Sequence, residues 1–147
     1  MKDWPPSKRS RHHYCWWHIY STRWGDNDMY GHVNHIIYYS MFDTVVNYFL
    51  IKNAGFDPIT SEYIGVTPET RCCYYESIGY PATVDVGIIV KKIGNSSITY
   101  EIGVFKKDSE TTCAVGHFVH VYVNRNNQNK VVSIPKKIAE ACRKITI

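Results

Sequence analysis

The chain has 147 residues, a length that suits one domain and leaves little room for a second. Hydrophobic residues make up 44% of the sequence and charged residues 20%, which is typical of a globular domain with a buried core. The formal net charge is +4, but the basic residues form no long stripe, so a nucleic-acid-binding surface is not expected. A small anionic ligand such as a nucleotide phosphate fits this charge.

The cysteines and the apolar runs indicate the compartment. The five cysteines are an odd number without a CxxC motif, and no signal peptide is visible, so we expect reduced thiols and a cytoplasmic location. No apolar run approaches the ~18 residues of a membrane span, so no membrane span is expected. The histidines lack the spacing of a known metal site, and we expect neither a metal nor a cofactor.

The first half of the chain predicts a lead-in, a strand, a loop and a long helix. Residues 1–12 are polar and basic with two adjacent prolines, so we expect a flexible N-terminal segment, followed by a single domain over residues 13–147. The aromatic and β-branched stretch 14–24 predicts a strand. Apolar residues at helical spacing predict a helix over 35–53, with Asn34 as its N-cap and Gly55 as its stop.

The second half of the chain predicts strands joined by short turns. Alternating apolar and polar residues and intervening turn signals mark strands at 65–76, 84–91, 98–104 and 112–123. Pro135 stands where a short C-terminal helix would begin. Tight turns imply antiparallel neighbours, so the sequence predicts an α+β fold in which one long antiparallel sheet covers one long helix.

The loop before the long helix concentrates the chemically useful side chains. Between residues 25 and 35 stand two aspartates, two histidines, two glycines and two asparagines. A helix start offers free N–H groups and a partial positive charge, which stabilise an oxyanion. A nearby carboxylate such as Asp28 can act as general base or nucleophile, so this loop is a candidate acyl-transfer site.

The same loop carries a family resemblance. Gly25-Asp26-Asn27-Asp28 followed by Gly31-His32-Val33-Asn34 resembles the signature of the 4-hydroxybenzoyl-CoA thioesterase-like branch of the hotdog superfamily. The resemblance extends over about residues 14–145 and includes the stretches 93–101 and 119–123. It implies the hotdog fold, in which the sheet wraps around the central helix.

The resemblance also implies a function and roles for single residues. The chain is expected to hydrolyse a thioester of coenzyme A or of an acyl carrier protein, as a homodimer or a dimer of dimers with the site at the subunit interface. Asp28 matches the catalytic carboxylate, while His32 and Asn34 are expected to position the water or the thioester. Tyr30, Gly31 and Tyr38 are the expected substrate-binding residues, and Asp26 is expected to be structural.

Several alternatives stay open at this point. Asp28 can be a turn residue, Asn34 a plain N-cap, and Asp43 in the helix is the candidate carboxylate of a second hotdog geometry. A hotdog hydratase or dehydratase, or a non-catalytic acyl-CoA-binding oligomer, would share the fold. The sequence also leaves open the acyl group, the carrier, and whether Asp28 activates water or forms a mixed anhydride.

Overall fold

The structure is a computed structural model, and it describes residues 4–147. It contains five strands and two helices in the order that the sequence predicts, preceded by the 3₁₀ turn η1 and with the 3₁₀ turn η2 after the first strand. The elements are η1 (Arg11–His13), β1 (Trp16–Ser21), η2 (Trp24–Asp26), α1 (His35–Ala54), β2 (Tyr63–Tyr74), β3 (Thr83–Ile93), β4 (Ser97–Lys106), β5 (Ala114–Asn124) and α2 (Lys136–Arg143).

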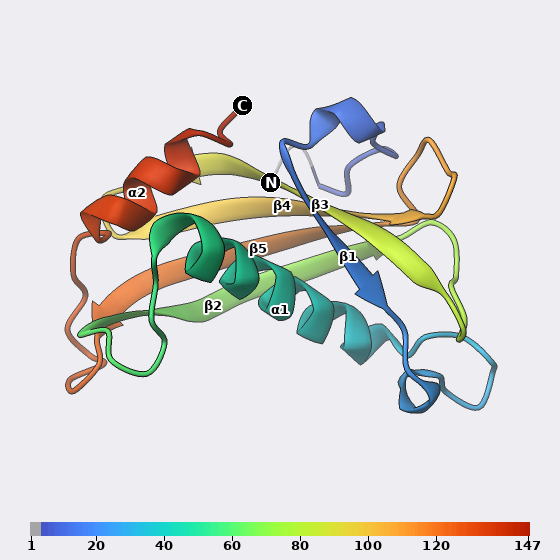
Figure 1. Ribbon diagram of the computed structural model, residues 1–147, viewed down its shortest axis with the longest axis horizontal. Helices are drawn as coiled ribbons and strands as arrows, with labels where there is room; N and C mark the ends of the chain where they lie inside the picture. The colour runs from blue at the N-terminus through green and yellow to red at the C-terminus, as the bar shows by residue number, and fades with distance from the viewer. Residues whose placement is uncertain (1–3) are drawn as a thin grey trace.

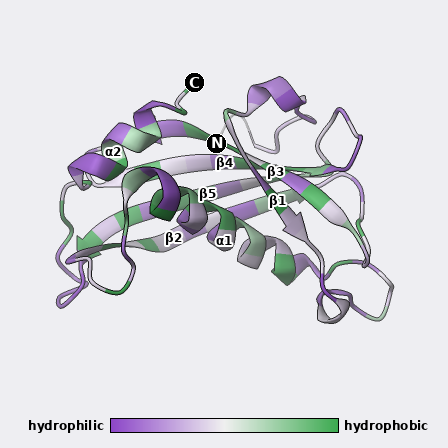
Figure 2. Cartoon of the chain, viewed as in Figure 1, coloured by the Kyte–Doolittle hydropathy of each residue, from purple (hydrophilic) through white to green (hydrophobic). Residues whose placement is uncertain are grey.

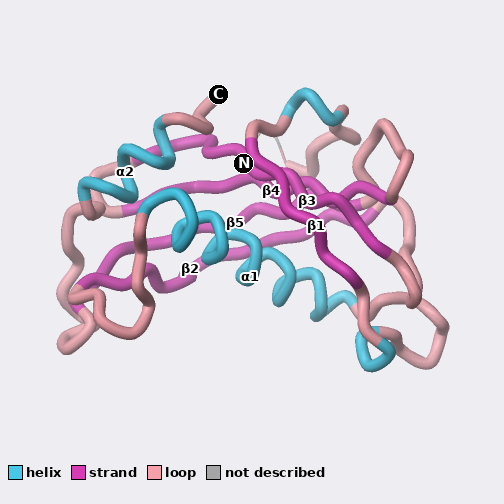
Figure 3. The backbone as a smooth tube through the Cα atoms, in the orientation of Figure 1, coloured by secondary structure: helices cyan, strands magenta, loops and turns pink. Residues whose placement is uncertain are grey.

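The five strands form one antiparallel sheet in the order β1-β3-β4-β5-β2. β3, β4 and β5 are consecutive in the chain and are joined by short turns, as the alternating pattern predicts. The sheet curves around α1, and α2 packs beside one end of that helix (Figures 1 and 3). β1 and β2 are the two edges, and β2 carries an irregularity between Val66 and Glu69.

The core lies between α1 and the concave face of the sheet. Alternate residues of each central strand point to this face, and the alternation of apolar and polar segments is visible along the strands (Figure 2). The ring of Phe42 is fully buried against Gly116 of β5, where a Cβ would lie 2.5 Å from it. The α1 residues Met41, Phe42, Val45 and Phe49 and the β3 residues Val84, Val86, Ile88 and Val90 belong to this core. Burial of this apolar surface is the main stabilising contribution.

The ends of α1 are set by the two residues that the sequence singles out. The Asn34 side chain accepts a hydrogen bond from the Ile36 N–H at 3.3 Å, so it caps the first turn. Gly55 adopts a left-handed conformation with φ of 63°, which ends the helix. The sheet covers one side of α1 only, and Ile36 on the opposite side remains 58% exposed.

The convex face of the sheet is covered by the N-terminal segment. Tyr14 packs with Ile89 and Phe105 in a second, smaller apolar cluster on this face. Of the segment 1–12 that was expected to be flexible, residues 1–3 lie outside the described part, while residues 4–12 contact the sheet. No helix in residues 4–147 is long and apolar enough to cross a membrane.

Candidate functional site

The loop between β1 and α1 is built around Asp26. Its carboxylate is fully buried and accepts the Arg23 N–H at 2.8 Å and the Arg23 guanidinium at 3.0 Å. Its backbone carbonyl accepts the Asn34 N–H at 2.8 Å. Asp26 therefore ties the end of β1 to the start of α1, which agrees with the structural role expected for it.

Asp28 lies at the tip of this loop in a half-buried position. Its Oδ1 atom accepts the N–H groups of Tyr30 at 2.9 Å and His32 at 3.4 Å, which fixes the orientation of the carboxylate. Within residues 4–147, its Oδ2 atom accepts no hydrogen bond and no cationic side chain forms an ion pair with it. Asp28 can therefore stabilise the turn through Oδ1 and still have Oδ2 free to accept a hydrogen bond from a ligand or water.

The loop docks on the connection between β2 and β3. The Val33 N–H donates to the Ile78 carbonyl at 2.7 Å, and the Tyr80 N–H donates to the Asn27 side chain at 3.0 Å. Gly79 approaches so closely that a Cβ there would lie 2.8 Å from the Gly31 carbonyl oxygen. These contacts place the two connections together at the N-terminal end of α1 (Figure 1).

A pocket of about 300 Å³ opens beside Asp28. It brings together three of the predicted site residues, and its lining is Asp28, His32, Val33, His35, Tyr38, Tyr74, Tyr75, Glu76 and Ser77. Of the other predicted residues, Tyr30 is 85% exposed, and neither it, Gly31 nor Asn34 belongs to this lining. Asp43 lies outside the pocket as well and forms a hydrogen bond with the Asn47 side chain at 3.0 Å.

Residues 74–77 were missed by sequence reasoning. Tyr74 ends β2 and residues 75–77 follow it, and the pairing of β2 with β5 carries all four to the start of α1; no local pattern reveals that register. The Tyr74 ring packs edge-on against Tyr38, with ring centroids 5.0 Å apart. Burial raises the pKa of both phenols, and the Tyr74 hydroxyl donates to the His35 carbonyl at 3.4 Å.

Glu76 is the second carboxylate of the pocket, and its surroundings differ from those of Asp28. Its side chain forms ion pairs with Lys8 at 3.3 Å and Lys106 at 3.4 Å. The hydrogen bond from Lys8, followed by the other contacts with these lysines, lowers the pKa of Glu76. Its charge is therefore already compensated, which leaves Asp28 as the carboxylate without a cationic partner among the described lining residues.

The start of α1 borders the same pocket. The Ile36 and Ile37 N–H groups bond to Asn34, through its side chain and its carbonyl respectively. The His35 N–H forms no hydrogen bond with any residue from 4 to 147. Because His35 lines the pocket, the pocket combines a carboxylate with the N-terminal end of a helix.

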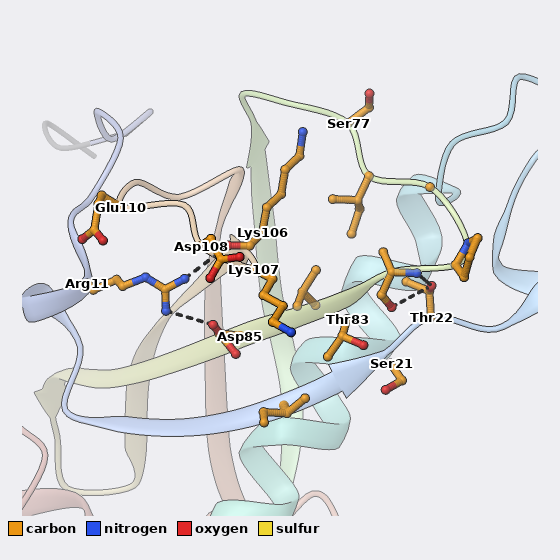
Figure 4. Close-up of a pocket in the computed structure, with 16 residues that line it drawn as sticks. Arg11, Ser21, Thr22, Ser77, Thr83, Asp85, Lys106, Lys107, Asp108 and Glu110 are labelled. Atoms are coloured by element: carbon orange, nitrogen blue, oxygen red, sulfur yellow. Dashed lines mark hydrogen bonds and ion pairs between the residues drawn. The ribbon is translucent and has the colours of Figure 1, made fainter.

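Figure 4 shows a larger hollow of about 990 Å³. It shares the lining residue Ser77 with the pocket beside Asp28. Its charged lining consists of Arg11, Lys106, Lys107, Asp85, Asp108 and Glu110, three of each sign. Arg11 forms an ion pair with Asp85 at 2.9 Å. The hollow therefore has balanced charge and lacks a carboxylate beside a helix start, so we place the candidate site in the smaller pocket.

Other chemistries find less support among residues 4–147. No group of three histidine, cysteine or acidic side chains is arranged to hold a metal ion in this part of the chain. The five cysteines are all free. Burial raises the pKa of Cys113 to about 11 and that of Cys72 to about 12, so both stay as thiols at neutral pH.

Comparison with known proteins places the chain in a family. The model of the thioesterase-like superfamily matches residues 22–142. The PA5185 protein from Pseudomonas aeruginosa is 38% identical, with 95% of this chain and 97% of that chain covered and a TM-score of 0.93. Among curated proteins, none matches the sequence significantly.

More distant structures share the fold. The BH1999 gentisyl-coenzyme A thioesterase is 22% identical, with 86% of this chain and 98% of that chain covered and a TM-score of 0.76. The DHNA-CoA thioesterase from Staphylococcus aureus is 21% identical, with 88% and 89% covered and a TM-score of 0.76. Together with the family match, which spans most of the sequence, this confirms the resemblance seen in the loop: the chain belongs to the thioesterase-like superfamily of hotdog-fold proteins.

Proposed function

We propose that this protein hydrolyses an acyl thioester of coenzyme A or of an acyl carrier protein, with Asp28 as the catalytic carboxylate. One observation carries the proposal: Asp28, whose Oδ2 atom accepts no hydrogen bond within residues 4–147, lines a pocket that is also lined by His35 at the start of α1. Family membership supports the same reaction, since the gentisyl-coenzyme A and DHNA-CoA enzymes share the fold.

The proposed reaction uses both parts of the pocket. The thioester carbonyl oxygen accepts the His35 N–H, which stabilises the negative charge that develops on that oxygen. Asp28 takes a proton from water as the water oxygen attacks the carbonyl carbon. The C–S bond then breaks, and the proton held by Asp28 passes to the sulfur, which leaves as a thiol. General-base catalysis contributes on the order of 10² to 10⁴ in rate, and one oxyanion donor roughly 3 to 4 kcal/mol.

The remaining residues take supporting roles in this proposal. His32 lines the pocket and positions the water or the thioester, whereas Asn34 holds the helix start through its cap. The acyl group contacts the edge-on pair Tyr38 and Tyr74. Tyr30 and Gly31, which are exposed beside the pocket, contact the substrate from outside the lining.

We further propose a homodimer, formed through the edge strand β2. This strand has 12 residues and pairs only with β5 in the described chain, so one row of its backbone groups is unpaired. Such an edge is a template for pairing with a second copy. Because Tyr74 ends β2 and lines the pocket, a partner at this edge would lie next to the site. The free cysteines fit the expected cytoplasmic location.

The experiment is a thiol-release assay on the purified protein with short, long and aromatic acyl-CoA substrates and with an acyl carrier protein thioester. Wild type should release thiol from at least one substrate class, and Asp28→Asn should not. Enoyl-CoA is included in the panel, and hydration of it without thiol release would replace thioester hydrolysis with a hydratase function. Binding of acyl-CoA without any turnover would instead support the alternative of a non-catalytic acyl-CoA-binding oligomer.

A further inference from the structure

The N-terminal segment, residues 4–14, is anchored on the convex face of the sheet by one buried carboxylate. Glu101 of β4 has a side chain only 4% exposed. It pairs with the Arg9 guanidinium at 3.2 Å and accepts a hydrogen bond from the Tyr14 hydroxyl at 2.9 Å, and the His13 Nε2 atom lies 3.0 Å from it. A buried carboxylate is costly without such partners, and all three come from the N-terminal segment.

Further contacts fix the course of the segment. Arg9 and Thr112 exchange hydrogen bonds, with the Arg9 N–H donating to the Thr112 hydroxyl and the Thr112 N–H donating to the Arg9 carbonyl, both at 3.0 Å. The Tyr14 ring lies on Gly87 and Gly103, where a Cβ would come within 2.8 Å and 2.3 Å of it. A side chain at either glycine would displace the ring, so these two positions are shaped to receive the segment.

The other part of the segment contacts the lining of the candidate site. The Lys8 ammonium pairs with Glu76 at 3.3 Å, and the Tyr75 hydroxyl donates to the Pro6 carbonyl. Tyr75 and Glu76 both line the pocket that contains Asp28. The segment therefore connects the buried Glu101 to residues 75–77, which form one wall of the pocket.

Besides Lys8, Lys106 pairs with the Glu76 side chain at 3.4 Å, and few contacts hold the backbone of this wall. The N–H groups of Tyr75 and Glu76 both donate to one carbonyl, that of Cys113, at 2.8 Å and 3.1 Å. The next backbone contact along the chain is the Ile78 carbonyl, which accepts the Val33 N–H of the catalytic loop. A shift of residues 75–77 would therefore change the width of the pocket directly.

We propose that the N-terminal segment positions residues 75–77 and thereby sets the geometry of the thioester site, without contacting the reacting atoms. The proposal rests on the function proposed above. The sequence leaves the basic residues of this segment without a role. In this proposal, Arg9 binds the segment to Glu101, and Lys8 binds it to Glu76 in the pocket lining.

The test uses two variants on either side of the connection and a matched control. Arg9→Ala removes the guanidinium that pairs with Glu101, and Arg9 lies outside the lining of the site pocket. Tyr75→Phe removes only the hydroxyl that contacts Pro6. Lys91→Ala is the control, because Lys91 lies 4.0 Å from the same Glu101 carboxylate but belongs to β3. Each variant is measured for kcat and KM, and for amide hydrogen exchange at residues 75–77.

We expect Arg9→Ala and Tyr75→Phe to lower kcat/KM on the order of tenfold, because small displacements of a site carry costs of that size or more. Exchange at residues 75–77 should accelerate in both, and Lys91→Ala should match wild type in both measurements. Unchanged exchange at 75–77 in Arg9→Ala, or an equal loss in the control, would overturn the proposal. A wild type without thioester turnover would sink the proposed function instead, and the exchange data would still decide whether the segment holds the wall.

Discussion

Asp26 and Asp28 stand two positions apart in one loop, and the structure predicts opposite consequences for the same substitution at each. In Asp26→Asn, the new amide group must face either the Arg23 N–H or the Arg23 guanidinium, since the two carboxylate oxygens accept from both. The position is fully buried, so the new amide N–H₂ group finds no acceptor there, even though water can reach the exposed Arg23 guanidinium. The side-chain contacts that hold the start of the loop weaken, and with them the position of the Asp26 carbonyl that accepts the Asn34 N–H.

The cost can be worked from these contacts. Leaving a buried donor without its acceptor costs about 1 to 3 kcal/mol. The Arg23 side chain is 72% exposed, so the ion pair itself adds little in solvent. We therefore expect Asp26→Asn to lower the free energy of unfolding by about 2 kcal/mol, which corresponds to roughly 6 °C in melting temperature for a domain of this size.

The assay is thermal unfolding of wild type, Asp26→Asn and Asp28→Asn under identical conditions. Asp28→Asn keeps an oxygen that can accept the Tyr30 N–H and is only half-buried, so its stability should stay within about 0.5 kcal/mol of wild type. If Asp26→Asn melted together with wild type, or if Asp28→Asn were the less stable of the two, the structural role assigned to Asp26 would be wrong.

Two further predictions concern the core. Burial lowers the pKa of His120 to about 4, so the folded state binds fewer protons than the unfolded chain below about pH 6.5. The free energy of unfolding should therefore fall by up to about 3 kcal/mol as the pH drops from about 6.5 toward 4. Chemical denaturation at pH 7 and pH 4.5 checks this, and the pH dependence should be smaller in His120→Gln. Gly116→Ala should lower the free energy of unfolding by about 1 to 3 kcal/mol, because its Cβ would lie 2.5 Å from the Phe42 ring. A Cβ at Gly25 would meet nothing within 4 Å, so Gly25→Ala should melt close to wild type. Equal melting temperatures of the two glycine variants would contradict this packing.

The sequence predicted the elements whose signals are local. The helix over 35–53 and its two ends at Asn34 and Gly55 agree with the structure, because a cap and a left-handed glycine act within one turn. The first strand is shorter than expected: the stretch 14–24 yields β1 over Trp16–Ser21, since Tyr14 packs on the convex face and η2 begins at Trp24.

The parts that sequence reasoning missed depend on contacts between distant residues. Tyr74 and Glu76 reach the pocket only because β2 pairs with β5, and that register has no signal within either strand. The contact of Lys8 with Glu76 spans 68 positions, so the basic N-terminal segment was expected to be flexible when it was considered alone. Asp28, His32 and Tyr38 were identified from the loop signature and the helix that follows it, and the structure places all three at one pocket.

The most direct test of the central claim is to compare Asp28→Asn with Asp43→Asn in the thiol-release assay, using the substrate that wild type hydrolyses. Asp43 is the carboxylate of the alternative hotdog geometry, yet it is exposed on α1 and lies outside the pocket. We predict that Asp28→Asn loses on the order of 10² to 10⁴ in kcat while its fold and oligomeric state stay those of wild type, and that Asp43→Asn keeps its activity. Normal turnover by Asp28→Asn, or loss of turnover in Asp43→Asn alone, would contradict the assignment of the catalytic carboxylate.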